Sequence, residues 1–369
     1  MKHRKHSKLE RPSGGVYHRN EWGVIGAPCS IIEDLVERVR EILSEKLEIG
    51  WIDADHHAGQ ASSKFQTCFT DKIDFTSFES NHKIGDQQYR KFFQHLDVLF
   101  VNGNHFLADK QIVIINEKKK ESLFRKLDRL TDPRLFVLDK GCDGIHSFLE
   151  GKWDIPIINI DEVEQIAHLI LEDWRNSHPP INGLILAGGK SQRMGGLDKG
   201  SITYHGLEQR EYMAQIVNQY AEETFLSLRK EQVGKVESSF QSIEDAFLGL
   251  GPFGGILSAF QRTPNAAWLT VACDLPYLSA STIAYLIANR DPRKLATCFH
   301  NSDTQFPEPL ITIWEPRAYP IMLEFLSMGY SCPRKVLINS DVLQLDLKDI
   351  QEIKNVNTPE DRDEALNSL

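Results

Sequence analysis

Glycine and cationic side chains gather in one short stretch of the chain, Leu184–Lys199. Its first four residues are apolar and predict a buried strand, which leads directly into Gly188 and Gly189. Glycine has no Cβ, so its backbone amides can approach phosphate oxygens closely, and Arg193 and Lys199 add positive charge nearby. A glycine-rich surface turn is the simpler alternative, but the strand and the cations favour a loop that holds a nucleoside triphosphate. It is not a Walker loop, because no Gly-Lys-Ser/Thr closes it.

An aspartate follows a second apolar run, Trp268–Cys273, which also predicts a buried strand. The strand is expected to end at Asp274, with Pro276 stopping it. A carboxylate at the C-terminal end of a buried parallel strand is a common ligand of Mg²⁺. The alternative is a cap for a helix that begins near Ser281. We therefore expect Asp274 to bind Mg²⁺.

The stretch Leu186–Lys199 follows the pattern LAGGxSxRMGGxDK almost without a break, and it resembles the signature of the MobA-type molybdenum cofactor guanylyltransferases. The resemblance covers about Ile181–Leu369. It implies a Mg²⁺-dependent nucleotidyltransferase that transfers GMP from GTP to molybdenum-bound molybdopterin and releases pyrophosphate. The residues that it implies are Lys199, Asp274 and Arg193 for catalysis, Asp274 for the metal, and Leu186, Ala187, Gly188, Gly189, Lys199, Ser227, Asp245, Asp274, Asn355 and Asn357 for the nucleotide and the pterin.

Two further segments support this resemblance. Asp245 precedes the run Gly251–Gly255, which is similar to the GPLAGI segment of the family and predicts a helix N-terminus beside the nucleotide. The segment Asn355–Asp361 resembles the NxNTPED box on the pterin side of the family, and Asn can both donate to and accept from a pterin edge. One departure is Ser227, which stands where the family has Asn.

The N-terminal half shows another α/β pattern. A strand at Glu21–Ile25, an amphipathic helix at Ile31–Leu47 and a strand at Ile49–Ile52 predict the start of a parallel sheet. This layout resembles a MobB-type P-loop domain, but Pro28 and Cys29 stand where Gly and Lys belong. We expect a degenerate P-loop-like domain without triphosphate hydrolysis, with a binding or assembly role towards molybdoenzymes or other cofactor-synthesis proteins.

Several local features allow two interpretations. The segment at Asp53, Asp55, His56 and His57 is either a metal site or, as we favour, a polar loop. Ser331–Lys335 begins a short helix whose cations either meet phosphate or lie at the surface. We also expect a strand at Ser201–Tyr204, a helix at Glu208–Ala221 and a strand at Thr224–Leu228.

Length and composition limit the number of domains and the classes of partner. The 369 residues predict two α/β domains, residues 1–178 and 181–369, each a mainly parallel sheet flanked by helices, with the second Rossmann-like. Pro179 and Pro180 mark the boundary. A net charge of −10 argues against nucleic-acid binding, and no apolar run reaches the ~20 residues of a membrane helix. No signal-peptide core follows the basic start, so we expect a cytoplasmic protein. Six scattered cysteines argue against a disulfide framework.

Two other functions stay open from the sequence. A sugar-phosphate or molybdopterin cytidylyltransferase would use a similar loop, although the cytidylyl relatives carry Ala-Gly in place of Gly188-Gly189. A non-catalytic scaffold that binds or delivers the cofactor is the second alternative. The NxNTPED-like segment argues against the sugar-phosphate enzyme, and the presence of Lys199, Asp245 and Asp274 together argues against the scaffold.

Overall fold

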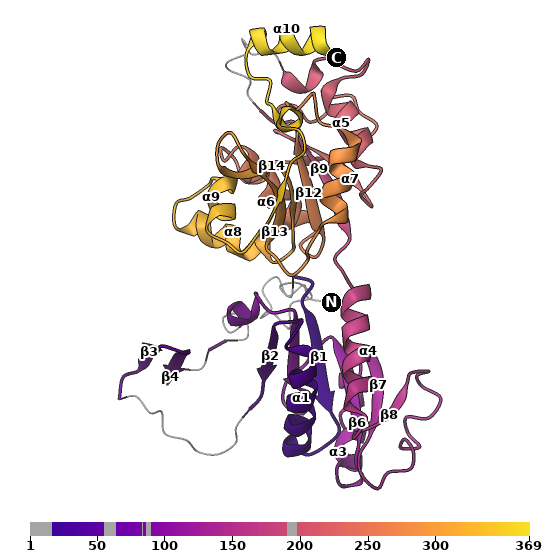
Figure 1. The fold of residues 1–369 in the computed structure, drawn as a ribbon. Coiled ribbons are helices and arrows are strands. Elements are labelled where there is room, and N and C mark those ends of the chain that lie inside the picture. The colour runs from indigo at the N-terminus through magenta and orange to yellow at the C-terminus, as the bar shows by residue number, and fades with distance from the viewer. Residues whose placement is uncertain (1–16, 55–63, 83, 86–89, 190–197) are drawn as a thin grey trace, which may run out of the picture. The chain divides into compact units, whose positions relative to one another are not determined.

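The computed structural model describes residues 17–54, 64–82, 84–85, 90–189 and 198–369. The described chain divides into two compact units (Figure 1). The N-terminal unit is Arg19–Ser177, and the C-terminal unit is His178–Leu369 together with the described residues up to His18. Arg193 and the segment 55–57 lie outside the described residues.

The N-terminal unit contains a six-stranded sheet in the order β2-β5-β1-β6-β7-β8, in which every pair is parallel. Buried parallel strands carry continuous apolar runs, which explains why the sequence pattern found them. These strands are β1 (Asn20–Ile25), β2 (Ile49–Ile52), β5 (Val98–Asn102), β6 (Lys110–Ile115), β7 (Pro133–Leu138) and β8 (Ile157–Asn159). The strands β3 (Thr67–Asp71) and β4 (Thr76–Ser80) form a separate antiparallel hairpin.

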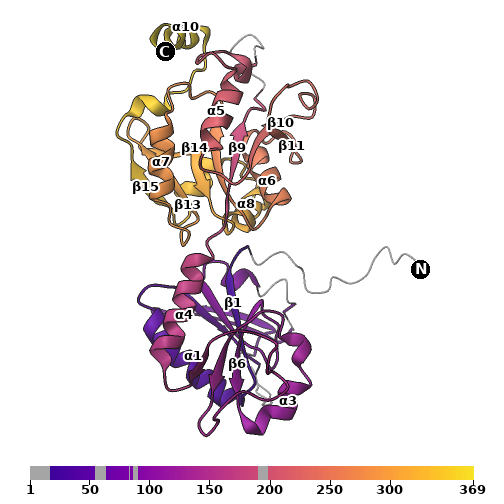
Figure 2. The same ribbon diagram turned by 90° about the vertical axis from the view of Figure 1, so that its right-hand side faces the viewer.

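Helices cover both faces of this sheet (Figure 2). The amphipathic helices α1 (Cys29–Leu43) and α4 (Val163–Asn176) pack together against one face, and their apolar residues share one core with the strands. The short helix α3 (Lys120–Phe124) contributes Leu123 to the core on the other face. The predicted helix was placed a few residues too late, because Pro28 and not the first apolar residue sets the start of α1.

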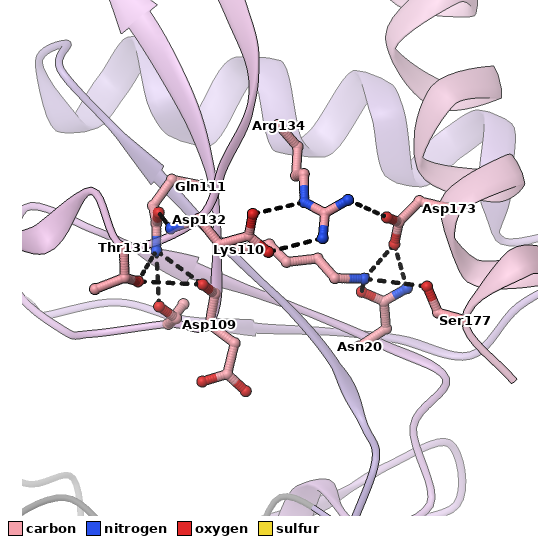
Figure 3. A network of polar contacts seen from close by, with 10 residues as sticks. Asn20, Asp109, Lys110, Gln111, Thr131, Asp132, Arg134, Asp173 and Ser177 are labelled. Atoms are coloured by element: carbon pink, nitrogen blue, oxygen red, sulfur yellow. Dashed lines mark hydrogen bonds and ion pairs between the residues drawn. The ribbon is translucent and has the colours of Figure 1, made fainter. Parts of the chain in front are cut away.

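A polar network fixes the end of α4 to the first residues of the strands (Figure 3). Lys110 Nζ pairs with the Asp173 carboxylate and lies 3.2 Å from Asn20 Oδ1. Arg134 makes two bonds of 2.8 Å to the Asp132 carboxylate and reaches Asp173 at 3.8 Å. Since these groups come from β1, β6, β7 and α4, the network sets the position of α4 on the sheet.

The C-terminal unit contains a seven-stranded sheet in the order β11-β10-β9-β12-β14-β13-β15. Within the described part of this sheet, only the pairs that β14 makes are antiparallel. Figure 1 labels most of these elements. They are β9 (Ile181–Leu186), β10 (Thr224–Leu228), β11 (Gln241–Glu244), β12 (Ala267–Ala272), β13 (Ala296–Asn301), β14 (Phe306–Trp314) and β15 (Leu343–Asp346). Both sheets are thus mainly parallel, which confirms the predicted fold class.

Two helical layers enclose the second sheet (Figure 2). Successive side chains of β9 illustrate this, since Leu184 packs into the core on one face and Ile185 into the core on the other. One layer contains α5 (Gln209–Val217) and α7 (Ala280–Ala288), and the opposite layer contains α6 (Pro252–Arg262), α8 (Ala318–Ser327) and α9 (Pro333–Ile338). The chain ends in α10 (Pro359–Ser368).

One predicted element is wrong. The expected strand at Ser201–Tyr204 is instead the 3-10 turn η5 (Lys199–Ser201) followed by a single bridge between Thr203 and Glu208. Asp198 caps this turn by accepting a bond of 3.0 Å from the Gly200 amide, and that local bond competes with strand pairing. None of the described helices is long and apolar enough to cross a membrane.

Candidate functional site

The candidate site lies where three parallel strands of the second sheet end side by side. Strand β9 lies between β10 and β12, and all three run in the same direction. The backbone continues these pairings past the strand ends, because Ala187 N donates to Ser227 O at 3.2 Å and Cys273 N donates to Leu186 O at 3.4 Å. Asp274 therefore emerges beside the residues that lead into Gly188.

Lys199 and Asp274 form an ion pair in this place. Lys199 Nζ lies 3.1 Å from Asp274 Oδ2, and the two side chains are 16% and 18% exposed. They come from segments 75 residues apart, so the fold and not local sequence brings them together. The prediction that both residues share one site therefore matches the geometry, although their roles stay predictions.

The C-terminal segment completes this cluster. Lys199 Nζ donates to Asn357 Oδ1 at 2.6 Å, and Asn355 Nδ2 donates to Asp274 Oδ1 at 3.0 Å. Between them, Val356 N donates to the Asp274 backbone carbonyl at 2.9 Å. The two asparagines thus hold opposite members of the ion pair, and we refer to Lys199, Asp274, Asn355 and Asn357 as the strand-end cluster.

A helix cap keeps this segment in position. Thr358 and Asp361 form a capping box at the start of α10. Asp361 Oδ2 accepts bonds from the amides of Asn357 and Thr358 at 3.0 and 2.9 Å. These backbone hydrogen bonds lower the pKa of the Asp361 carboxyl, because they favour its charged form. The predicted helix start and the predicted site therefore depend on the same residues.

Two supporting residues were not predicted from the sequence. Arg210, whose side chain is 4% exposed, donates to Asp198 Oδ2 at 3.0 Å. Gln232 Nε2 lies 3.4 Å from the same oxygen and 3.3 Å from Ala187 O. Both side chains thus hold Asp198, the residue that precedes Lys199. A charged residue on the buried side of the expected helix at Glu208–Ala221 was the only signal available in the sequence.

A second polar group lies on the other side of β9. Ser227 Oγ donates to Asp245 Oδ1 at 2.9 Å. A Cβ built on Gly255 would meet Ser227 Oγ at 2.5 Å and Leu186 Cδ2 at 3.1 Å, so α6 approaches the strand ends closely only because Gly255 is there. A Cβ on Gly188 would meet Asp245 Oδ2 at 3.4 Å. The predicted residues on both sides of β9 thus surround the entry to the glycine loop.

Asp245 has a perturbed proton affinity. Its partial burial raises the pKa of the carboxyl above the usual 3.8; the Ser227 bond and Arg229 act in the opposite direction, and Glu244 adds to the rise. The folded chain therefore holds this proton more tightly than the unfolded chain. Consequently the contribution of Asp245 to stability is greatest at low pH and is lost as the pH rises above the usual pKa.

The raised pKa of Asp245 predicts how the stability of the variant Asp245→Asn depends on pH. Because the amide removes the buried charge, we expect the variant to gain stability relative to the parent chain between about pH 4 and pH 7. Urea unfolding with pulsed hydrogen–deuterium labelling of β10 peptides measures this for the C-terminal unit. Asp346→Asn, an exposed aspartate in β15, is the control. A relative stability of Asp245→Asn that falls across this pH range would contradict the prediction.

Two features of the sequence allowed two interpretations, and the first is the pair of cations Arg334 and Lys335 in α9, which could meet phosphate or lie at the surface. Arg334 bonds to the buried Glu308 carboxylate at 3.3 Å and to Pro307 O, and the ammonium of Lys335 lies 4.6 Å from the Tyr330 ring centroid. Burial raises the pKa of Glu308.

The second feature is the segment that begins at Asp53, of which residues 55–57 lie outside the described part of the chain. The described residues contain no cluster of three or more His, Cys, Asp or Glu side chains able to hold a metal ion.

Comparisons with known proteins address the same region. Residues 183–341 match the family described as the MobA-like NTP transferase domain. A molybdenum cofactor biosynthesis bifunctional protein from Synechocystis sp. (strain ATCC 27184 / PCC 6803 / Kazusa) is 37% identical over 186 residues, 50% of this chain and 53% of that protein. The chain thus spans about half the length of that relative.

A molybdenum cofactor guanylyltransferase from Shewanella sp. (strain MR-4) is 30% identical over 152 residues, which are 40% of this chain and 76% of that protein. Among solved structures, the molybdopterin-guanine dinucleotide biosynthesis protein A from Archaeoglobus fulgidus gives a TM-score of 0.42 at 18% identity, covering 51% of this chain and 97% of that chain.

Proposed function

This chain belongs to the molybdenum cofactor guanylyltransferase family, and from that premise we propose that its C-terminal unit transfers GMP from GTP to molybdenum-bound molybdopterin. The observation that carries the proposal is the strand-end cluster, in which Lys199 and Asp274 meet at 3.1 Å beside the glycine loop. A terminal phosphate oxygen of molybdopterin attacks the α-phosphorus of GTP. The bond from that phosphorus to the bridging oxygen breaks, and pyrophosphate leaves.

The acceptor phosphate already carries a nucleophilic oxygen, so positioning and charge neutralisation dominate the chemistry. We assign Lys199 and the backbone amides of Gly188 and Gly189 to the phosphates of GTP. Ser227 and Asp245 face the nucleoside from the other side of β9, and Leu186 and Ala187 shape the loop entry. Arg193, outside the described residues, is the second candidate to stabilise charge in the transition state.

The chemistry of Asp274 suits Mg²⁺. Its carboxylate accepts one bond from Lys199 and one from Asn355, which leaves lone pairs on both oxygens. Mg²⁺ usually takes one or two protein carboxylates together with substrate phosphates. Bound Mg²⁺ would neutralise charge on the phosphates. Asn355 and Asn357 orient the Asp274 and Lys199 side chains and are also our candidates for the pterin edge.

We propose a binding or assembly role for the N-terminal unit, towards molybdoenzymes or other cofactor-synthesis proteins. The loop between β1 and α1 supports this role, because Pro28 and Cys29 replace the glycine and lysine of a Walker loop there. Without the lysine, one attraction for the β- and γ-phosphates is lost. The proposal also implies a cytoplasmic protein, since GTP and reduced thiols are found there.

Substrate competition tests the proposed function. The full chain is incubated with Mg²⁺ and equimolar GTP and CTP, with molybdenum-loaded molybdopterin as one acceptor and a hexose 1-phosphate as the other. We expect a guanine dinucleotide of the pterin and pyrophosphate. A cytosine product would reassign the base, and a GDP-sugar would favour the sugar-phosphate enzyme. Binding of both substrates without any product would support the non-catalytic scaffold.

A further inference from the structure

A thiol and an imidazole face each other in the N-terminal unit, at the carboxyl end of its parallel sheet. Cys29 Sγ lies 3.4 Å from His105 Nε2. Cys29 is the first residue of α1, and His105 follows the end of β5. Both residues are partly exposed. The pair occupies the loop region where a P-loop protein would carry its lysine, and the proposed transfer of GMP does not use it.

The loops that carry the two side chains are bonded to each other. Asn104 Nδ2 donates to Ala27 O at 2.9 Å, and Asn104 N donates to Asn102 Oδ1 at 3.1 Å. The loop before Cys29 is also tightly fixed, because Gly26 has a φ of +101° and a Cβ there would lie 2.3 Å from Ile114 O. The two backbone segments that carry the thiol and the imidazole are therefore held next to each other.

Two cationic side chains bind the loop that carries His105. Lys126 Nζ donates to Asn104 O at 3.1 Å, and Arg129 Nη1 donates to the same carbonyl at 3.1 Å. Lys126 interacts electrostatically with Cys29. In addition, Cys29 begins a helix of 15 residues, whose N-terminus attracts negative charge. Two acids flank this region: Asp53 follows β2 and accepts a bond of 2.8 Å from Asn102, and Glu33 lies one helical turn after Cys29 in α1.

We propose that Cys29 and His105 form a thiolate–imidazolium pair, and that Cys29 is a site of covalent modification by hydrogen peroxide. The thiolate sulfur attacks one peroxide oxygen and the O–O bond breaks. The product is a sulfenic acid, and the departing hydroxide takes the proton of the His105 imidazolium to become water. Sulfur loses two electrons, and peroxide gains them.

The pair is tested on the full chain by alkylation with iodoacetamide at about pH 6.5, with peptide mapping of each cysteine by mass spectrometry. We expect Cys29 to react about tenfold faster than the exposed Cys332, even though Cys29 is less exposed. His105→Gln keeps a hydrogen-bonding side chain but cannot hold the proton. We expect it to reduce the Cys29 rate to that of Cys332 or below.

Cys142 in the same unit is the fold control, and its rate should not change in His105→Gln. If the Cys142 rate does change, a second measurement compares the ultraviolet thiolate absorbance of the parent chain with that of Cys29→Ser. Thiolate absorbance that is present in the parent chain below about pH 7 and missing in Cys29→Ser supports the pair. Hydrogen peroxide followed by dimedone should label Cys29 before Cys332. Equal alkylation rates for these two cysteines, or dimedone labelling without preference, would overturn the proposal.

Discussion

Asp274→Asn is expected to lower kcat by roughly a thousandfold, the largest effect of any single substitution in the strand-end cluster. The substitution preserves the shape of the side chain but removes the only carboxylate among the four residues of that cluster. Lys199 then loses its negative partner, and the site loses the carboxylate that would hold Mg²⁺. Initial rates of pyrophosphate release at saturating GTP measure the effect, and the loss should persist at every Mg²⁺ concentration.

Asp303→Asn is the matched control, because Asp303 is an exposed aspartate in the turn between β13 and β14. It should release pyrophosphate at the parent rate. Thermal unfolding of both variants reports on the fold, and we expect similar midpoints. Pyrophosphate release by Asp274→Asn within about tenfold of the parent rate would remove Asp274 from the proposed mechanism.

Lys199→Met is expected to lower kcat/KM by about 10²- to 10³-fold. The thioether side chain has similar length and fills similar space, but it brings no charge to the triphosphate. Because Lys199 also holds Asp274 at 3.1 Å and Asn357 at 2.6 Å, the variant should weaken GTP binding and slow the transfer together. Separate measurements of kcat and KM for GTP show how the loss divides.

Lys294→Met is the control for this variant, since the ion pair described for the Lys294 side chain is with Asp341, just before β13 and outside the strand-end cluster. The double variant Lys199→Met/Asp274→Asn adds a sharper test. Residues that act as one unit are not additive, so the double variant should be little worse than Asp274→Asn alone. Fully additive losses would mean that the two side chains act at separate steps.

The parts of the site that depend on short-range pattern could be predicted from the sequence. The strand at Thr224–Leu228 has the predicted bounds, and so does the strand at Ile49–Ile52. Buried parallel strands have continuous apolar runs, and a polar or glycine residue marks their ends clearly. The expectation that Asp274 lies at the end of a buried strand followed from this rule, whereas its place in one site with Lys199 was implied by the family resemblance.

The parts that depend on long-range contacts could not be predicted. Arg210 appeared to be one charge on a helix, and only the fold shows that it bonds to Asp198. The strand predicted at Ser201–Tyr204 does not form, because the turn at Lys199–Ser201, which Asp198 caps, outweighs the β-propensity of the residues that follow. The bonds of Asn355 to Asp274 join positions 81 residues apart, which no local pattern can show.

The central claim is that the strand-end cluster and the glycine loop together transfer a nucleotide from GTP. The most direct measurement follows GTP labelled in the α-phosphate and, separately, in the γ-phosphate, with the full chain, Mg²⁺ and molybdenum-loaded molybdopterin. The account predicts that the α-label appears in the pterin dinucleotide and the γ-label in pyrophosphate, and that Asp274→Asn slows the formation of both products by roughly a thousandfold. An α-label that remains in GDP while the γ-label appears as inorganic phosphate would contradict it.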